Sequence, residues 1–172
     1  MLNVIRIIGK AAIFVCALWA LTLLSLFFHE FGHALGYMLA TGDRKWHIEI
    51  GQGKKILDTK ALTVNLFVID GYFTPIEDKS VSAAQQVLAL SGGPIASLLI
   101  IIGLLVLRFG GSPPSPEIFA SGMVRALFLI VLVINMLILL WSVIPANGFF
   151  RNMEDVGTDV MQIIKALKRR RE

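Results

Sequence analysis

The stretch that decides the fold is residues 11–39, AAIFVCALWALTLLSLFFHEFGHALGYML, whose first eighteen residues carry no charge. It is longer than the roughly 20 apolar residues that a helix needs to cross a bilayer. His29 and His33 lie four residues apart, so on a helix both imidazoles project from one face, about one turn apart. One zinc ion can bridge this spacing, and Glu30 is then placed beside the metal as a base for activating water. The stretch therefore predicts a metal site at membrane depth.

The composition of the whole chain agrees with a membrane protein. Of its 172 residues, 56% are hydrophobic, which a soluble domain of this length could carry only with a large exposed apolar surface. The single cysteine, Cys16, excludes an intrachain disulfide and a zinc site built from thiolates. The formal net charge is +4, but Lys and Arg flank the apolar stretches. We therefore expect the lipid bilayer as a partner, and no nucleic acid.

Three stretches are long and apolar enough to cross a membrane. They cover about residues 11–39, 83–107 and 121–144. We therefore expect a mainly α, polytopic membrane protein that forms a single domain over residues 1–172. Between the first two spans, residues 41–79 contain alternating and β-prone segments, which predict a small hairpin or sheet at the membrane surface. The tail, residues 145–172, turns polar after Pro145 and contains a predicted amphipathic helix that begins near Thr158.

The distribution of Lys and Arg predicts the orientation in the membrane. With three crossings, residues 41–79 and the tail lie on the same side, and each carries six Lys or Arg. The remaining basic residues are Arg6, Lys10, Arg108 and Arg125. The positive-inside rule then places the N-terminus outside, and the metal site and the C-terminus on the cytoplasmic side. The short loops favour a prokaryotic plasma membrane.

A catalytic zinc site needs a third protein ligand, with the fourth position left for water. Asp159 lies at the start of the predicted tail helix, on the same side as the two histidines, although the helix dipole alone also favours an aspartate there. The competing donors are Glu154, Asp155 and His47. Distance along the sequence does not fix coordination geometry, so these alternatives stay open.

Three further regions of the chain contain motifs that are considered together with His29 and Glu30. The second span opens with Ser91-Gly92-Gly93-Pro94-Ile95-Ala96-Ser97. The β-prone segment contains Ile50-Gly51-Gln52-Gly53 and, later, Asp70-Gly71-Tyr72-Phe73. Asn135 lies in the third span, and Pro145 follows it. In order and spacing, these motifs resemble those of the site-2 proteases, a family of intramembrane zinc metalloproteases with a catalytic core of three transmembrane helices. The similarity extends over nearly the whole chain.

The resemblance implies an intramembrane protease that hydrolyses a peptide bond in or near a transmembrane segment of a membrane-protein substrate. It implies Zn²⁺ as the cofactor, with His29, His33 and Asp159 as ligands. Glu30 would be the catalytic base, taking a proton from water and returning it to the leaving amine.

The resemblance also implies roles for residues outside the metal site. Gly51, Gly53 and Gly71 lie in the segment that helps to present an extended substrate in the family, although ordinary turn chemistry also explains glycines there. Asn135 is similar to an asparagine that precedes the third ligand in the family.

Two positions depart from the family pattern. Ser97 stands where asparagine is usual, and Asn147-Gly148 stands where the family has its Asp-Gly ligand motif. Asn147 could be a weaker, neutral ligand, or the site could be degenerate. The alternative function is therefore a proteolytically inactive membrane protein on this scaffold, which binds transmembrane clients or a regulatory partner. The intact Glu30 argues against it, because metal binding alone requires no base.

Overall fold

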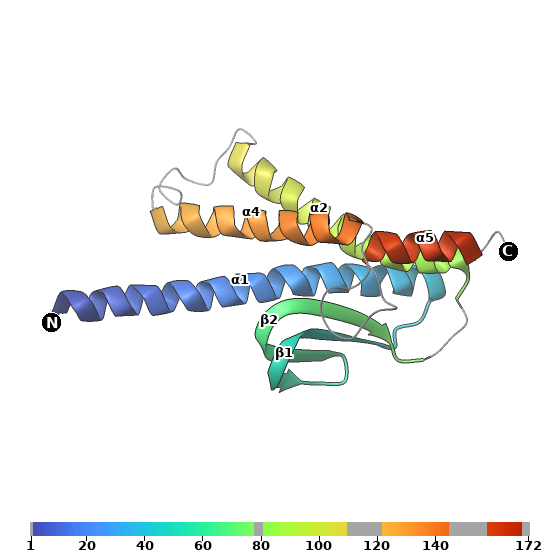
Figure 1. Cartoon of the computed structure of the whole chain (residues 1–172), viewed down its shortest axis with the longest axis horizontal. Coiled ribbons are helices and arrows are strands. Elements are labelled where there is room, and N and C mark those ends of the chain that lie inside the picture. The colour runs from blue at the N-terminus through green and yellow to red at the C-terminus, as the bar shows by residue number, and fades with distance from the viewer. Residues whose placement is uncertain (1, 78–80, 110–121, 145–157, 170–172) are drawn as a thin grey trace.

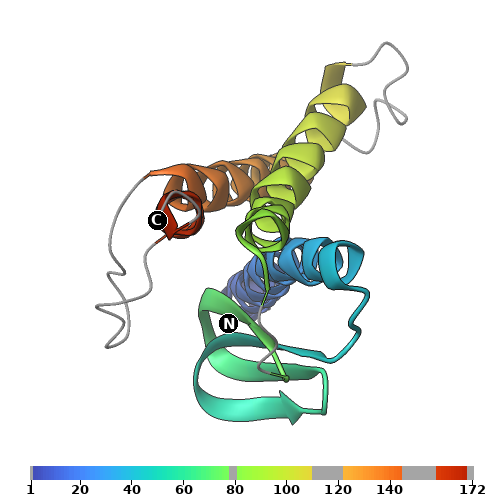
Figure 2. The same cartoon turned by 90° about the vertical axis from the view of Figure 1, so that its right-hand side faces the viewer.

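The computed structural model describes residues 2–77, 81–109, 122–144 and 158–169. Within these residues the elements are α1 (Leu2–Thr41), β1 (Trp46–Asp58), β2 (Leu62–Pro75), α2 (Ala83–Phe109), α4 (Gly122–Val143) and α5 (Asp159–Arg169). The three long helices α1, α2 and α4 form a bundle, and the two strands lie along the second half of α1 (Figure 1). Seen along the bundle, α1 lies between the strands and the other helices (Figure 2).

Three helices in the described part of the chain are long and apolar enough to cross a membrane. They are Asn3–Thr41, Ala83–Phe109 and Gly122–Val143. The prediction of a mainly α protein with three membrane-spanning helices is thereby confirmed at the level of length and composition. Helix α1 begins at Leu2, nine residues before the predicted apolar stretch, because no proline interrupts its first turns. Its 40 residues correspond to about 60 Å, twice the thickness of the hydrocarbon core, so part of α1 lies beyond that core.

Helices α1 and α2 approach closely because glycines line their contact. A Cβ atom added at Gly36 would lie 2.7 Å from the carbonyl oxygen of Leu88. An added Cβ at Gly32 would collide with the backbone of Gly92, and the reverse also holds. Gly32 and Gly36 have the spacing of small residues that lets membrane helices pack backbone to backbone. The contact brings α2 against the face of α1 that carries the two histidines.

The predicted sheet is an antiparallel hairpin that curls back on itself. Ile48 of β1 lies opposite Phe73 near one end of β2 and also opposite Leu62 at the other end. Gly51 and Gly53 have φ angles of 77° and 90°, a region that residues with a side chain rarely adopt. These two glycines form the bend in β1, so the sheet's own geometry requires them.

The sheet packs on α1 through a small apolar core. Ile48 and Ile50 are fully buried and contact Leu26 and Ala34 of α1. Near the middle of α1, the indole nitrogen of Trp19 donates a hydrogen bond of 2.8 Å to the carbonyl of Leu66 in β2. The sheet therefore reaches farther along the first span than the predicted position at the membrane surface requires.

The short helix α5 agrees with the predicted tail helix. It begins at Asp159, directly after Thr158, and the amide of Gln162 donates to the Thr158 carbonyl at 3.0 Å. Ala166 is buried, and α5 lies beside the first turns of α2 (Figure 1). This packing directs the first turn of α5 at the two histidines of α1.

Candidate metal centre

His29, His33 and Asp159 form a group of potential metal ligands within the described residues. Each offers one ligand atom, and these atoms all lie within 4.8 Å of one another. The Nε2 atom of His29 is 3.4 Å from Asp159 Oδ2, and that of His33 is 3.4 Å from Asp159 Oδ1. Two ligands of a tetrahedral zinc with bonds of about 2.0–2.1 Å stand about 3.4 Å apart. The spacing between the carboxylate and each imidazole therefore fits zinc.

The second nitrogen of each imidazole has a partner on α2. His29 Nδ1 is 2.9 Å from Ser97 Oγ, and His33 Nδ1 is 3.1 Å from the carbonyl oxygen of Ala89. A proton on Nδ1 donated to these oxygens leaves the lone pair of Nε2 free, which is the tautomer that a metal-binding histidine needs. The two rings stand at 87° to each other with centroids 5.0 Å apart. Helix α2 thus contacts both rings at Nδ1 and orients them with Nε2 toward Asp159.

Gly93 leaves open the space in front of the two histidines. A Cβ atom at Gly93 would lie 2.8 Å from His29 Nε2, and it would lie still closer to His33 Nε2. Every other amino acid would therefore place an atom against the two nitrogens that face Asp159. Two imidazole nitrogens and a carboxylate around this space are the donor types that zinc takes in proteins.

Asp159 is held by hydroxyl groups as well as by the imidazoles. Ser142 Oγ, near the end of α4, donates to Asp159 Oδ2 at 2.5 Å, and Thr158 Oγ1 donates to the carbonyl of Ile144 at 2.6 Å. Burial acts to raise the pKa of the Asp159 carboxyl. The neighbouring imidazoles of His29 and His33 outweigh burial and hold this pKa well below its usual range, so the carboxylate is ionised at neutral pH.

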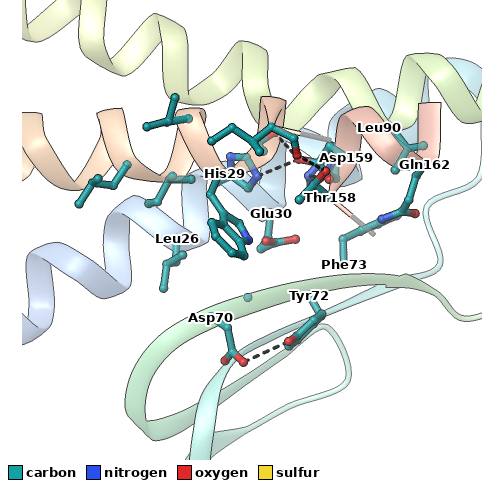
Figure 3. A pocket seen from close by; sticks show the side chains of 18 of the residues that line it. Leu26, His29, Glu30, Asp70, Tyr72, Phe73, Leu90, Thr158, Asp159 and Gln162 are labelled. Atoms are coloured by element: carbon teal, nitrogen blue, oxygen red, sulfur yellow. Dashed lines mark hydrogen bonds and ion pairs between the residues drawn. The ribbon is translucent and has the colours of Figure 1, made fainter. Parts of the chain in front are cut away.

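Glu30 lies between the ligand group and strand β2 (Figure 3). It is only 6% exposed and lines a cavity together with Gly71 and Phe73 of β2. A Cβ atom at Gly71 would lie 2.8 Å from Glu30 Cγ, so the glycine lets the strand pass directly over the acid. The carboxylate therefore separates the metal ligands from the edge of β2.

A cavity of about 540 Å³ contains the histidines, Glu30 and Asp159 on its walls. Strand β2 forms one side through Ile69 to Phe73, and α4 forms much of the other side. The apolar residues that α1, α4 and the position just after α4 contribute are Leu26, Leu137, Ile138, Leu140, Trp141 and Ile144. Leu137 and Trp141 remain 59% and 47% exposed, so the cavity has an apolar flank at the outer surface of the bundle.

The structure places the predicted substrate-binding glycines in two different environments. Gly71 lines the cavity beside Glu30. Gly51 and Gly53 form the bend of β1 and are not among the residues that line the cavity. A Cβ atom at Gly51 would collide with the backbone of Phe67, which gives this glycine a conformational role within the sheet.

The other predicted site residues lie elsewhere or outside the described residues. Asn135 is fully buried in α4 and donates to Ser25 Oγ at 3.0 Å, one helical turn before His29. His47 lies on β1, with Nδ1 3.1 Å from the carbonyl oxygen of Lys60, and does not belong to the ligand group. The competing ligands Asn147, Glu154 and Asp155 fall outside the described residues.

Several site residues were not predicted from the sequence. Ser142 and Gly93 were not recognised as contacts of the ligands, and the contact of Ser97 with His29 was not foreseen. The spacing of Ala89, Gly93 and Ser97 at intervals of four, opposite Gly32 and Gly36, is a signal that could have located the close helix contact. No comparable signal points to Ser142.

The chain matches no protein-family model, and neither a curated protein nor a solved structure matches it. The relationship to the site-2 proteases therefore remains a hypothesis, which is based on the motifs and on the geometry of the metal centre.

Proposed function

We propose that the protein is an intramembrane zinc metalloprotease of the site-2 type. The observation that carries this proposal is the convergence of His29, His33 and Asp159 on one small space, with Glu30 at its border. The three ligands come from α1 and α5, and all of them are largely buried, with 7% of each histidine side chain and 15% of the Asp159 side chain exposed. Three ionisable groups at this depth are costly unless they bind something, which favours a metal as their occupant.

The donor set fits a catalytic zinc better than a structural one. Two imidazoles and one carboxylate leave a fourth tetrahedral position for water or substrate. When bound, zinc supplies a Lewis acid and an activated water. Their Nδ1 contacts with α2 would keep the Nε2 atoms of His29 and His33 directed at a bound ion.

Glu30 is the proposed general base. It follows His29 directly on α1, and its carboxylate lies between the ligands and β2 (Figure 3). In this position it takes a proton from the attacking water and returns it to the leaving amine. Burial of Glu30 excludes bulk water from the proton transfer.

Strand β2 is the proposed binding edge for an extended substrate. A transmembrane helix hides its peptide bonds in internal hydrogen bonds, so it has to unwind before cleavage. Gly71 and Phe73 of β2 line the cavity beside Glu30. Main-chain pairing at such an edge binds a peptide without requiring a particular sequence.

The apolar flank of the cavity indicates the class of substrate. Leu137 and Trp141 on α4 face Ile69 and its neighbours on β2 across the cavity. Apolar side chains of an unwound transmembrane segment fit between these walls. We therefore propose a membrane protein as substrate, cleaved in or near its transmembrane segment on the side of the metal centre.

The alternative, an inactive membrane protein that binds transmembrane clients or a regulatory partner, draws its support from Ser97 and Asn147. The contact of Ser97 with His29 weakens it, because serine at this position still orients the imidazole. The cytoplasmic orientation and the prokaryotic plasma membrane remain predictions from the sequence.

The decisive experiment measures zinc and cleavage on the same purified protein in lipid nanodiscs. We expect one zinc per chain, and cleavage of a reporter transmembrane helix with a helix-breaking glycine pair. Glu30→Gln should keep its zinc and lose at least about 100-fold in rate, because it removes only the base. Asp159→Ala should lose both zinc and cleavage. A parent without zinc, or a Glu30→Gln variant that cleaves like the parent, would overturn the proposal.

A further inference from the structure

The junction between α4 and α5 is held by two hydroxyl groups. Ser142 donates to the carboxylate of Asp159, seventeen residues away, and Thr158 donates to the carbonyl of Ile144, fourteen residues away. Ser142 and Thr158 are buried, with exposed fractions of 4% and 8%. The two bonds run in opposite directions, from α4 to α5 and from the residue before α5 to the residue after α4. We call this pair of bonds the hydroxyl latch.

The latch acts on the ligand that the backbone restrains least. His29 and His33 share one long helix, and α2 holds both of their rings. Asp159 stands in the first turn of a helix of 11 residues. Its side chain has rotamers that turn away from the histidines, so an additional contact is needed to select the binding one.

The geometry of the two bonds shows how such selection works. The Ser142 hydroxyl bonds the same oxygen, Oδ2, that faces His29 Nε2, so the other oxygen is left to face His33. Thr158 immediately precedes the ligand, and its bond to Ile144 fixes where α5 starts relative to α4. Ile144 lies just beyond α4, where carbonyl groups lack partners within the helix. The latch therefore sets both the rotamer and the position of Asp159.

We propose that Ser142 and Thr158 are positioning residues for the third metal ligand, so that zinc affinity depends on the latch as well as on the three ligands. This inference rests on the proposed metal centre. It assigns no contact between either hydroxyl and the metal. It implies that the protein binds zinc tightly only when the ends of α4 and α5 are joined.

The test uses the full-length protein in nanodiscs and four variants. Ser142→Ala removes one bond of the latch, and Thr158→Val removes the other while it preserves the shape of the side chain. Ser142→Thr keeps a hydroxyl at the same position. Ser91→Ala is the matched control, because the Ser91 hydroxyl bonds the Val87 carbonyl within α2 and touches no ligand.

The zinc dissociation constant is measured by competition with a chromogenic chelator. We expect an increase of about 10- to 100-fold for Ser142→Ala, as for other residues that orient metal ligands. Thr158→Val should weaken binding by a smaller factor, because it acts on Asp159 only through the backbone. Ser142→Thr should restore most of the affinity, and Ser91→Ala should leave it unchanged.

Thermal unfolding separates positioning from a structural role. Zinc raises the unfolding temperature more when it binds the folded protein more tightly. Ser142→Ala should unfold near the parent temperature without metal but gain less stability from zinc. A Ser142→Ala variant that binds zinc like a zinc-binding parent overturns the latch and leaves the proposed function intact. A parent without zinc overturns both.

Discussion

The two halves of the proposed metal centre are built in different ways. The half formed by α1 and α2 contributes His29 and His33 from one helix, whose glycines bring it against α2. The half formed by α4 and α5 contributes Asp159 from a short helix, held by the hydroxyls of Ser142 and Thr158. The first half depends on backbone packing, and the second depends on side-chain hydrogen bonds.

This difference between backbone packing and side-chain hydrogen bonds indicates which half of such a site can move or accept a substitution. A contact between backbones across glycines tolerates no added atom, because protein interiors have no spare volume. A contact through two hydroxyls can open without disrupting either helix. A metal that binds both halves would therefore stabilise the second half more than the first. The free energy of metal binding adds to the stability of the half that becomes ordered when the metal binds.

The largest expected effect comes from filling the space in front of the histidines. Gly93→Ala places a methyl group against both Nε2 atoms, so zinc affinity should fall by about 100-fold or more, beyond the usual cost of altering a residue next to a ligand. Gly103→Ala, at a position of α2 with no atom within 4 Å of an added Cβ, is the control. Zinc titration of both variants makes the comparison. Unchanged affinity in Gly93→Ala would mean that the metal does not lie between the imidazoles and Asp159.

The next effect tests whether the first half depends on close backbone packing. Gly32→Ala forces the backbones of α1 and α2 apart at Gly92, which should cost about 1–3 kcal/mol of stability, as other overpacking substitutions do. Gly9→Ala lies on the same helix, where an added Cβ meets nothing within 4 Å, and should not destabilise the protein. Thermal unfolding in nanodiscs without metal compares the two. Equal unfolding temperatures would contradict the glycine contact.

The smallest effect concerns Glu30, which lies between the two halves and belongs to neither. In Gly71→Ala the added methyl meets the flexible side chain of Glu30, which can move by a few tenths of an ångström. We expect the rate of cleavage of the reporter helix to fall by about tenfold, because a misplaced general base supplies only part of its rate acceleration. Zinc affinity should stay at the parent value. A rate that falls only in parallel with zinc affinity would show that Gly71 supports the ligands instead of the base.

The part of the site that is local in sequence could be predicted, and the part that is assembled from distant segments could be predicted only as alternatives. The interval of four between His29 and His33 requires no tertiary knowledge, because helical periodicity alone places both rings on one face. Asp159 was one of several donors near the end of the chain, and its proximity to the histidines depends on the packing of α5 against α2. Ser142 gave no signal, because a serine in an apolar helix usually bonds its own backbone.

The fold was predictable to a similar degree. Apolar length identified the three spanning helices, and β-prone alternation identified the hairpin. The curl of the hairpin and its contact with Trp19 were not predicted, since strand register depends on partners that a single sequence does not reveal.

The sequence by itself determined that this chain has three helices long and apolar enough to span a membrane, and a pair of histidines with an acid beside them on the first helix. These features follow from composition and from the helical repeat, both of which act over a few neighbouring residues. Only the tertiary structure decided that Asp159 reaches the histidines, that Gly93 leaves room between them, and that Ser142 holds the carboxylate. Such contacts join residues far apart in the chain, and they form only when the glycines let α2 approach α1 and α5 packs beside α2.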